Sequence, residues 1–267
     1  MRVLDWQEFI EGGEQEKATM TIGVFDGVHR GHQALIAKIV SRGPCPTVIT
    51  FKQNPKWVLS PQTYEGDIFS LDQKLAAFEQ LGISRTVLID FSGNFSKLRG
   101  REFIGLLMDR GNLSYLAIGS NFHCGYGLDT DALGIRAMTE ERGILTEVVS
   151  PVFDGADPVS SSRIRASISA GDFTGAGAAL GRNVEIDLGG IFVSTGAGVL
   201  VFDTALARRI IPPDGWYEVV VHEMNRINTI EGKKTEIFIK DRKLGIPSSF
   251  NTVQRMRVEF LARYVPD

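Results

Sequence analysis

Two histidines, His29 and His32, lie three residues apart in a glycine-rich segment near the start of the chain. Residues 18–25 before them are apolar or β-branched and predict a buried strand, and residues 33–40 after them carry apolar side chains at helical spacing. A turn from a strand into a helix favours a phosphate, because backbone N–H groups and the positive end of the helix dipole point there. We expect both imidazoles to share one face of the first helical turn, where they would stabilise charge on a transferring phosphoryl group without a covalent nucleophile.

Two other interpretations of this segment stay open. The histidines could be ordinary surface residues, although two histidines, three glycines and an aspartate within residues 23–32 argue against that. Zinc is the second alternative, but it needs a third and a fourth ligand. The other histidines are His123 and His222, and the two cysteines do not form a pair, so phosphate chemistry is the preferred hypothesis.

A second segment, residues 159–165, combines three consecutive serines with Arg163 and Arg165. Hydroxyl groups and helix N-terminal amides can surround phosphate oxygens, and a guanidinium presents a planar fork suited to phosphate. Alone, this segment is better explained as a serine N-cap followed by solvated arginines, but together with the histidine segment it favours phosphate binding. The Gly-x-Gly pairs at 175–177 and 196–198 lack the rest of a dinucleotide fingerprint, so dinucleotide oxidoreduction is not favoured.

Composition limits the possible partners. A net charge of −3 over 267 residues argues against a nucleic-acid binder. Cys45 and Cys124 have no metal or redox spacing, which suits a reducing cytoplasm. Residues 1–6 do not read as a signal peptide, and no apolar run approaches the ~18–20 residues of a membrane helix. We therefore expect a cytoplasmic protein without nucleic-acid or membrane partners, of unknown oligomeric state.

Strand and helix patterns alternate over the first two-thirds of the chain, which predicts an α/β fold with a parallel sheet. Ligands of such sheets bind at the carboxyl ends of the strands. The histidine segment, residues 50–55 and residues 119–127 all follow strands, so we expect them to gather at one edge. The remaining strands are expected over 47–51, 85–91, 114–119 and 145–150, and helices over 70–81, 100–110, 131–142 and from about 163.

The pattern changes after about Arg182. Residues 185–202 are rich in Gly, Val and Ile without a helical period, and 216–221, 235–240 and 256–261 resemble strands. These short strands predict a small β-barrel-like domain. The predicted domains are therefore residues 1–182 and 183–267.

Four motifs in the first domain carry a family resemblance. The first is Gly23-x-Phe25-Asp26-Gly27-x-His29-x-Gly31-His32, and the others are Thr50-Phe51 with Asn54-Pro55, Gly119-Ser120-Asn121-Phe122 through Gly125, and Ser160-Ser161-Ser162-Arg163-Ile164-Arg165. In this order they resemble the bacterial FAD synthetases, the bifunctional riboflavin kinase/FMN adenylyltransferase proteins, whose first domain is a Rossmann-like His-x-Gly-His nucleotidyltransferase. Three positions depart from the family pattern: Asn54 replaces His, Cys124 replaces the second Phe of the third motif, and Ser162 replaces Thr.

The second domain resembles the riboflavin kinase barrel of that family in degenerate form. Residues 211–217 resemble its Pro-Pro-x-Gly-x-Tyr turn, and residues 258–261 resemble a late strand. The Gly-Phe-Pro-Thr-Ala-Asn motif appears as residues 201–206, with Leu206 in place of an Asn that holds magnesium and ATP in the family. Leucine offers no oxygen to a hard cation, so riboflavin kinase activity is not expected, although the resemblance makes Glu236 a candidate for the family's catalytic Glu.

The resemblance implies an FMN adenylyltransferase, which converts ATP and FMN to FAD and pyrophosphate through in-line attack of the FMN phosphate on the α-phosphorus. It implies Mg²⁺ brought with ATP, without identifying metal ligands. The catalytic residues it implies are His29, His32 and Arg163. The nucleotide-binding residues it implies are Gly23, Phe25, Asp26, Gly27, Gly31, Asn121, Ser161, Ser162 and Arg165, and weaker flavin-binding candidates are Asn54 and Pro55.

Two alternatives remain beside this function. The chain could be a non-catalytic flavin- or nucleotide-binding protein on the same scaffold, or a nucleotidyltransferase for another acceptor phosphate. The retained histidine pair and Ser-Arg segment favour an enzyme, because a binding module would not need both.

Overall fold

The computed structural model of the protein describes residues 1–13, 16–91, 93, 95–196, 198–224, 230–250 and 255–264. Contacts divide the chain into two compact units. The α/β unit comprises Met1–Gln62 and Lys74–Pro158, and the β unit comprises Thr63–Gln73 and Val159–Asp267. The predicted boundary between two separately folding domains, after residue 182, stays a prediction.

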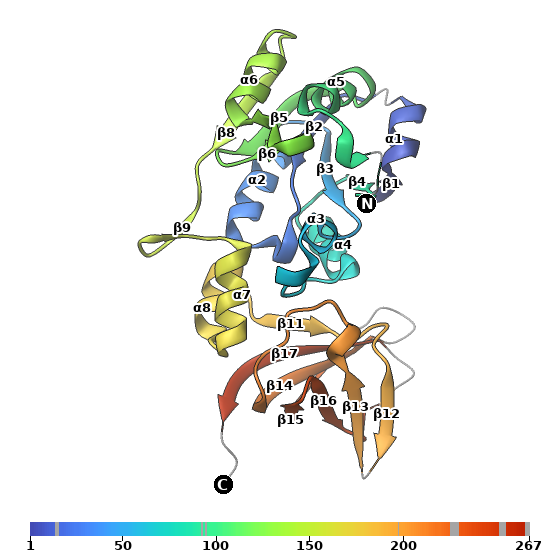
Figure 1. Ribbon diagram of the computed structural model, residues 1–267, viewed down its shortest axis with the longest axis vertical. Coiled ribbons are helices and arrows are strands. Elements are labelled where there is room, and N and C mark those ends of the chain that lie inside the picture. Colours follow the sequence, from blue (N-terminus) through green and yellow to red (C-terminus); the bar gives the residue numbers. More distant parts are fainter. Residues whose placement is uncertain are drawn as a thin grey trace. The chain divides into compact units, whose positions relative to one another are not determined.

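Six parallel strands form the sheet of the α/β unit, in the order β1-β4-β3-β2-β5-β8 (Figure 1). Strands β2 and β4 are buried at every position, as expected when helices cover both faces of a parallel sheet. This arrangement confirms the predicted α/β class. The strands are β1 (Arg2–Asp5), β2 (Ala18–Ile22), β3 (Cys45–Phe51), β4 (Arg85–Ile89), β5 (Leu113–Gly119) and β8 (Leu145–Val149).

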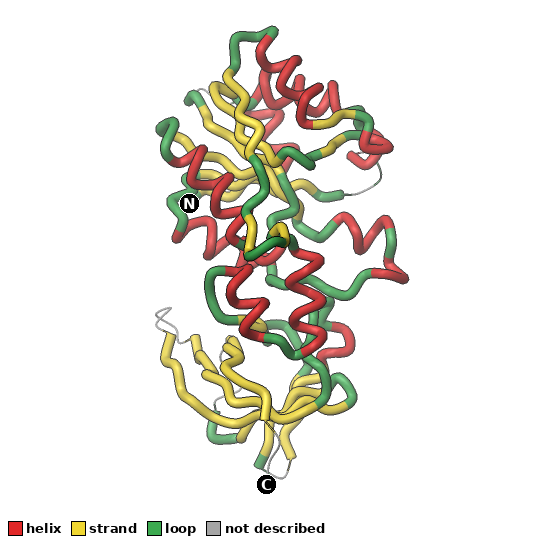
Figure 2. The backbone as a smooth tube through the Cα atoms, turned by 90° about the vertical axis from the view of Figure 1, so that its left-hand side faces the viewer, coloured by secondary structure: helices red, strands yellow, loops and turns green. Residues whose placement is uncertain are grey.

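Helices flank this sheet, red beside the yellow strands in Figure 2. One apolar core joins Phe9, Phe103 and Leu107 of the helices to Met20 and Leu116 of the strands, each at most 4% exposed. Burying such side chains contributes about 1.5–3 kcal/mol each and fixes the helices on the sheet. The helices are α1 (Trp6–Gly12), α2 (Arg30–Val40), α3 (Pro55–Leu59), α4 (Leu71–Gln80, whose first three residues belong to the β unit), α5 (Gly100–Arg110) and α6 (Ala132–Glu140).

Short elements complete the α/β unit. They are the 3₁₀ turns η1 (Asp26–Val28), η2 (Pro61–Thr63), η3 (Phe95–Lys97) and η4 (Tyr126–Leu128), and the two-stranded pairs of β6 (His123–Cys124) with β7 (Thr130–Asp131) and β9 (Phe153–Asp154) with β10 (Asp157–Pro158).

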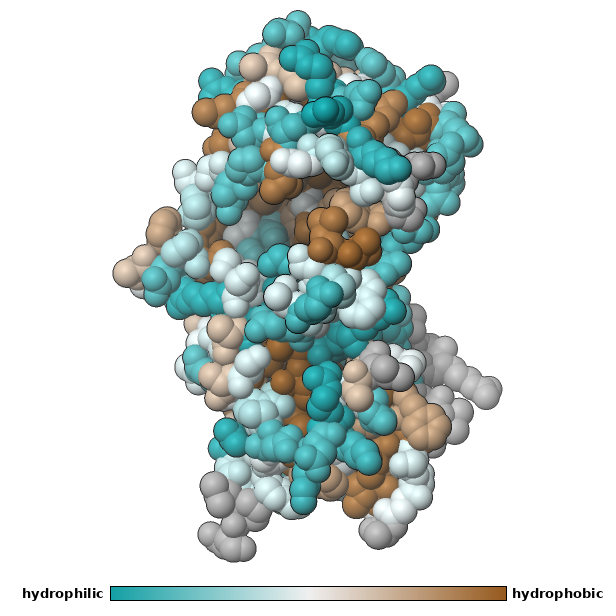
Figure 3. All heavy atoms as spheres, in the orientation of Figure 1, coloured by the Kyte–Doolittle hydropathy of each residue, from teal (hydrophilic) through white to brown (hydrophobic). Residues whose placement is uncertain are grey.

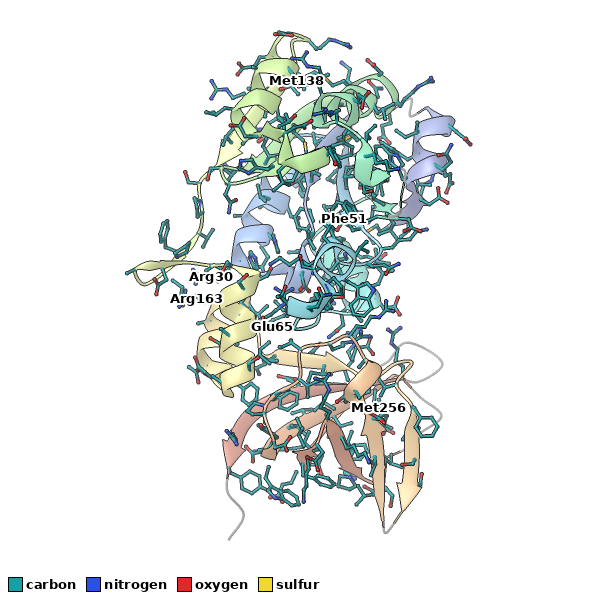
Figure 4. The ribbon with its side chains drawn as sticks, viewed as in Figure 1. Arg30, Phe51, Glu65, Met138, Arg163 and Met256 are labelled. Carbon is teal, nitrogen blue, oxygen red and sulfur yellow. The ribbon has the colours of Figure 1, made fainter. Side chains whose placement is uncertain are left out.

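The β unit is built on a curled antiparallel sheet of seven strands, in the order β11-β17-β14-β15-β16-β13-β12 (Figure 2). Its core stacks Phe173 on Phe260 with ring centroids 5.1 Å apart, and Tyr217 meets both rings edge-on. Met256, labelled in Figure 4, is 2% exposed in the same unit. The elements are α7 (Ser161–Ala170), α8 (Phe173–Leu180), β11 (Val184–Asp187), β12 (Val193–Gly196), β13 (Val199–Asp203), η5 (Thr204–Leu206), β14 (Gly215–Met224), β15 (Ile230–Lys240), β16 (Lys243–Pro247) and β17 (Arg255–Tyr264).

The excursion Thr63–Gln73 packs on the β unit although it lies early in the chain. Arg165 donates from Nε to the Gly66 carbonyl at 2.8 Å, and the Ser70 hydroxyl donates to Asp187 at 2.6 Å. Gly66 has φ +109°, and a Cβ there would lie 2.4 Å from the backbone of Arg209. Only glycine permits this approach without displacing the backbone.

Most predicted elements are confirmed with ends shifted by a few residues. The helix predicted over 100–110 has those bounds, and Ser70 and Gln73 form both hydrogen bonds of a capping box at the start of the helix predicted over 70–81. The strand predicted to reach residue 25 ends at Ile22, because the turn begins earlier. Strand β1 and helix α1 were missed, since a four-residue strand and a seven-residue helix give little periodicity.

Candidate functional site

The carboxyl ends of β2, β3 and β5 lie side by side. Strand β2 pairs in parallel with β3 on one side and with β5 on the other. The chain runs outward from β2 through β3 to β4, and β5 then returns to the opposite side of β2. Ligands bind at such a switch in strand order. The predicted gathering of the histidine segment, residues 50–55 and residues 119–127 at one edge is therefore confirmed.

The turn after β2 has an unusual backbone. Phe25 and Val28 have φ of +53° and +39°, and Gly27 between them has φ +76°. Positive φ is costly for a β-branched residue such as Val28, so packing must hold it. Phe25 and Val28 are fully buried, and Phe25 meets Phe78 edge-on at 5.6 Å. Strained backbone held by a core is a common feature of functional sites.

The two histidines form a stacked pair. Their ring centroids lie 3.6 Å apart with an angle of 17° between the planes, and Phe25 lies 5.0 Å from the His32 ring. His29 is the N-cap of α2, and its Nδ1 accepts from the His32 N–H at 3.4 Å. With Nδ1 as acceptor, the neutral His29 ring carries its proton on Nε2 and can donate it in a hydrogen bond. The predicted shared face is thus confirmed.

The N-terminus of α2 supplies the rest of the predicted anion site. Gly31 lies in its first turn, and Asp26 is 5% exposed in the turn before it. Arg30, labelled at this end of α2 in Figure 4, lies 4.0 Å from Asp154. The cluster of three metal-ligating side chains found among the described residues lies elsewhere, on the sheet of the β unit.

Lys74 is a site residue that sequence reasoning missed. It is 8% exposed, and its Nζ lies 2.8 Å from the Phe51 carbonyl, 3.3 Å from Thr50 Oγ1 and 3.4 Å from the Val24 carbonyl. The Thr50 hydroxyl itself donates to the Val24 carbonyl at 3.1 Å. The ammonium thus ties the carboxyl ends of β2 and β3 together. Its one sequence signal is a lysine after a capping box, which normally indicates a solvated helix residue.

The residues after β3 and β5 occupy different surroundings. Asn54 is 7% exposed and caps α3, where its Oδ1 accepts from Lys56 N–H at 3.1 Å and Pro55 takes the first helical position. Asn121 is exposed in the turn after β5. The face drawn in Figure 3 is hollowed between the regions of β6 and α3, with apolar and polar side chains around the hollow.

A cavity of about 910 Å³ is lined by His123 of the third motif and by residues 128–131, which follow that motif in the chain. Two of its lining carboxylates cap helices, since Asp129 accepts from the Gly100 N–H and Asp131 from the Gly134 N–H. Burial, and then the charge of Asp129, raises the pKa of the nearby Cys124 thiol to about 12. Cys124 therefore stays a neutral thiol and does not act as a nucleophile near neutral pH.

The Ser-Arg segment belongs to the β unit. Ser160 caps α7, its Oγ accepting from the Arg163 N–H at 3.2 Å, so the helix begins at Ser161 rather than near Arg163. Ser162 is exposed and Arg163, labelled in Figure 4, is half-buried. Arg165 is 5% exposed, and its Nε donates to the Gly66 carbonyl within this unit; its predicted contact with the nucleotide stays a prediction.

In residues 201–206, which resemble the kinase motif, two polar side chains form hydrogen bonds with the backbone of the β unit. Thr204 is fully buried, and its hydroxyl donates to the Arg242 carbonyl at 2.5 Å. Asp203 Oδ1 accepts from the Ala205 N–H at 3.0 Å. Glu236 is exposed, and a hydrogen bond to it is the main cause that raises the pKa of Tyr264 to about 12.

Comparison with known proteins adds to this geometry. A family model described as FAD synthetase matches residues 12–163. A bifunctional riboflavin kinase/FMN adenylyltransferase of Pseudomonas fluorescens is 30% identical over 216 residues, covering 78% of this chain and 69% of the relative. An FAD synthetase of Listeria monocytogenes is 27% identical over 232 residues, covering 85% of this chain and 90% of the relative.

A solved structure shares the fold. The structure titled as a macrolide-efflux protein from Streptococcus pneumoniae superposes with a TM-score of 0.82 at 23% identity, covering all of this chain and 92% of the other. No helix in the described part of this chain is both long and apolar enough to cross a membrane. The family match spans the histidine turn at the switch in strand order and reaches Arg163, and the chain belongs to the FAD synthetase family of nucleotidyltransferases.

Proposed function

We propose that this chain is an FMN adenylyltransferase that forms FAD and pyrophosphate from FMN and ATP. The observation that carries the proposal is the stacked His29–His32 pair at the N-terminus of α2, at the switch in strand order. A helix N-terminus attracts phosphate, and an imidazole beside it can donate to a phosphoryl oxygen as negative charge develops there. Membership of the FAD synthetase family supports FMN as the acceptor.

The proposed step is a direct displacement. An oxygen of the FMN phosphate forms a bond to the α-phosphorus of ATP, the bond from that phosphorus to the β-phosphate bridging oxygen breaks, and pyrophosphate leaves. Catalysis then consists of positioning and charge stabilisation. His29 Nε2 and His32 donate to the transferring phosphoryl group, and the strained turn at Phe25 and Val28 holds both rings in place.

The other predicted residues take supporting roles. Arg163, Ser161 and Ser162 bind the pyrophosphate end of ATP, and Gly23, Gly27 and Gly31 keep side chains away from the phosphates. Asn121 contacts the nucleotide. Asp26 shapes the turn, and Asn54 and Pro55 contact the flavin through the start of α3.

Magnesium is proposed to arrive with ATP. Mg²⁺ prefers oxygen ligands and is often held by substrate phosphates, waters and one or two protein oxygens. Asp26 and Asn121 are oxygen donors in the turns after β2 and β5. These residues fit such a site, in which the metal would neutralise phosphate charge.

Riboflavin kinase activity is proposed to be absent. The hydroxyl of the buried Thr204 donates its hydrogen bond to the Arg242 carbonyl, and the Leu206 side chain has no oxygen that could bind a cation.

Incubation of the purified protein with Mg·ATP and FMN, followed by chromatography, tests the main proposal. FAD and an equal amount of pyrophosphate are expected. Parallel reactions contain pantetheine phosphate or nicotinamide mononucleotide in place of FMN. Transfer to one of these alone would identify a different acceptor, and no transfer to any of the three would favour a binding protein.

A further inference from the structure

Three side chains with metal-ligating atoms meet on the sheet of the β unit. Glu185, Glu259 and His222 lie on β11, β17 and β14, which are neighbours in that order. One ligand atom from each lies within 4.8 Å of the other two. The side chains of His222 and Glu259 are 18% and 22% exposed, so the cluster is partly desolvated but open on one side.

The two carboxylates are arranged as if for a cation. Glu185 and Glu259 are directly opposite each other on antiparallel strands, and like charges in that position are destabilising. His222 Nε2 lies 2.7 Å from Glu259 Oε2, and Asn183 donates to the other oxygen, Oε1, at 2.6 Å. Asn183 therefore orients the Glu259 carboxylate so that Oε2 points toward the group. Such outer-shell hydrogen bonds are typical of metal ligands.

We propose that Glu185, His222 and Glu259 bind a divalent transition-metal ion such as Zn²⁺, with water completing its coordination. Imidazole nitrogen and carboxylate oxygen are both zinc ligands, whereas Mg²⁺ prefers oxygen alone. Zinc bonds of about 2.1 Å place tetrahedral ligand atoms roughly 3.4 Å apart. The outermost atoms must close by up to about 1.4 Å, which rotation of a glutamate side chain provides.

The consequence of this site would be structural. Strand β11 is an edge strand, and β17 and β14 are the next two strands of the sheet. A metal bound by residues of all three strands would link the edge strand β11 to β17 and β14. Its binding free energy would add to the stability of the β unit.

Zinc titration of chelator-treated full-length protein tests the proposal, with calorimetry for affinity and thermal unfolding for stability. One equivalent is expected to bind and to raise Tm, while Mg²⁺ at equal concentration does neither. Glu185→Gln and His222→Gln are each expected to abolish the Tm shift and weaken binding at least tenfold. Glu218→Gln on β14 and His123→Gln are matched controls that should retain both.

Two further variants, at residues that do not bind the metal themselves, should change the zinc affinity in opposite directions. Asn183→Ala should weaken binding about 10–100-fold, the usual range for an outer-shell partner. Arg257 lies opposite His222 on β17, so Arg257→Gln removes a competing positive charge and should tighten binding several-fold. FAD formation is expected to stay unchanged throughout, which separates this site from the proposed activity. Failure to bind zinc, or zinc binding that survives both Glu185→Gln and His222→Gln, would overturn the proposal.

Discussion

At the residue scale, the stacked histidine pair is the feature most open to direct test. His32 lies in the first turn of α2, between the His29 ring at 3.6 Å and the Phe25 ring at 5.0 Å. His32→Ala is expected to lower kcat by about 10²–10³, or ~2.7–4 kcal/mol, as for the loss of one oxyanion donor. ATP affinity, measured by calorimetry, should fall much less, because the interaction forms mainly in the transition state.

His123→Ala is the matched control, since His123 is an exposed histidine of the same unit. Its turnover should equal that of the parent protein. If His32→Ala also keeps parental turnover while remaining folded, His32 has no part in the chemistry.

Lys74 gives a second residue-scale prediction. Its ammonium contacts oxygens on the segments that follow β2 and β3, so Lys74→Met leaves buried acceptors without that donor. Such a loss typically costs about 1–3 kcal/mol of folding stability. Because the same oxygens flank the histidine turn, kcat for FAD formation should also fall, whereas FMN and ATP binding should weaken less.

Urea unfolding and steady-state kinetics measure both effects of the Lys74 change. Lys56→Met is the control, because Lys56 is exposed at the start of α3. A Lys74→Met protein that is destabilised but turns over at the parental rate would reduce the role of Lys74 to folding alone.

Sequence reasoning reached the histidine pair because its spacing and flanking patterns are local. It could not reach Lys74, because a buried lysine looks like any other helix lysine until the strands around it are known. It also could not assign the positive φ of Phe25 and Val28, which tertiary packing imposes against local preference. The same holds for Arg165, whose bond to the Gly66 carbonyl depends on an excursion 99 residues earlier.

At the scale of elements, the β unit depends on a buried carboxylate that joins three segments: strand β11, strand β17 and the stretch Thr63–Gln73. Asp187 on β11 is fully buried and accepts from Arg255 of β17 at 2.6 Å and from the Ser70 hydroxyl. Arg255 also contacts Asp72 in the first turn of α4. Burial acts to raise the pKa of Asp187, but hydrogen bonds from Arg255, Ser70 and the Gly189 N–H outweigh it and lower the pKa below its ordinary value.

The pH dependence of stability follows from that direction. A carboxyl with a lowered folded pKa contributes fully above its unfolded pKa of about 3.9, and this contribution is lost as pH falls through the lower folded pKa. Asp187→Asn is expected to cost roughly 2–3 kcal/mol near neutral pH, less than the 3–5 kcal/mol of a fully buried pair because Arg255 is partly exposed and keeps Asp72.

Urea unfolding near neutral pH and below about pH 4 checks this prediction. The difference in the free energy of unfolding between the parent protein and the Asp187→Asn variant should become smaller as the pH falls. If this difference in unfolding free energy stays constant from neutral pH to below about pH 4, ionisation of Asp187 does not stabilise the fold.

Element prediction succeeded where a segment crosses the core with clear periodicity. Helix α5 and strands β3 and β5 were placed from their apolar and β-branched residues. The pairs β6–β7 and β9–β10 were missed, because two-residue strands carry no period. Assigning Thr63–Gln73 to the β unit was beyond sequence patterns, since the bonds at Gly66 and Ser70 are non-local.

At the scale of the whole molecule, the two units differ in what they retain. The α/β unit carries the four-residue His-x-Gly-His core of the first motif, while the β unit carries the segment that resembles the riboflavin kinase motif with three different residues. Leu206 and Val201 replace Asn and Gly, and Asp203 replaces Pro. The histidine pair of the proposed reaction therefore lies in the α/β unit, while Arg163 and its neighbouring serines lie in the β unit.

The last prediction is that this protein forms no FMN from riboflavin. Thr204 is fully buried with its hydroxyl hydrogen on the Arg242 carbonyl, so it cannot turn to a metal without breaking that bond. Asp203 is the strongest counter-argument, because its exposed carboxylate could replace the missing oxygen ligand. Its Oδ1, however, already accepts from the Ala205 N–H and stabilises the turn η5. Riboflavin with Mg·ATP should therefore yield no FMN by chromatography, while FMN supplied to the same preparation yields FAD. If FMN does form and Asp203→Asn abolishes it, the carboxylate has taken over the metal contact and the chain is bifunctional.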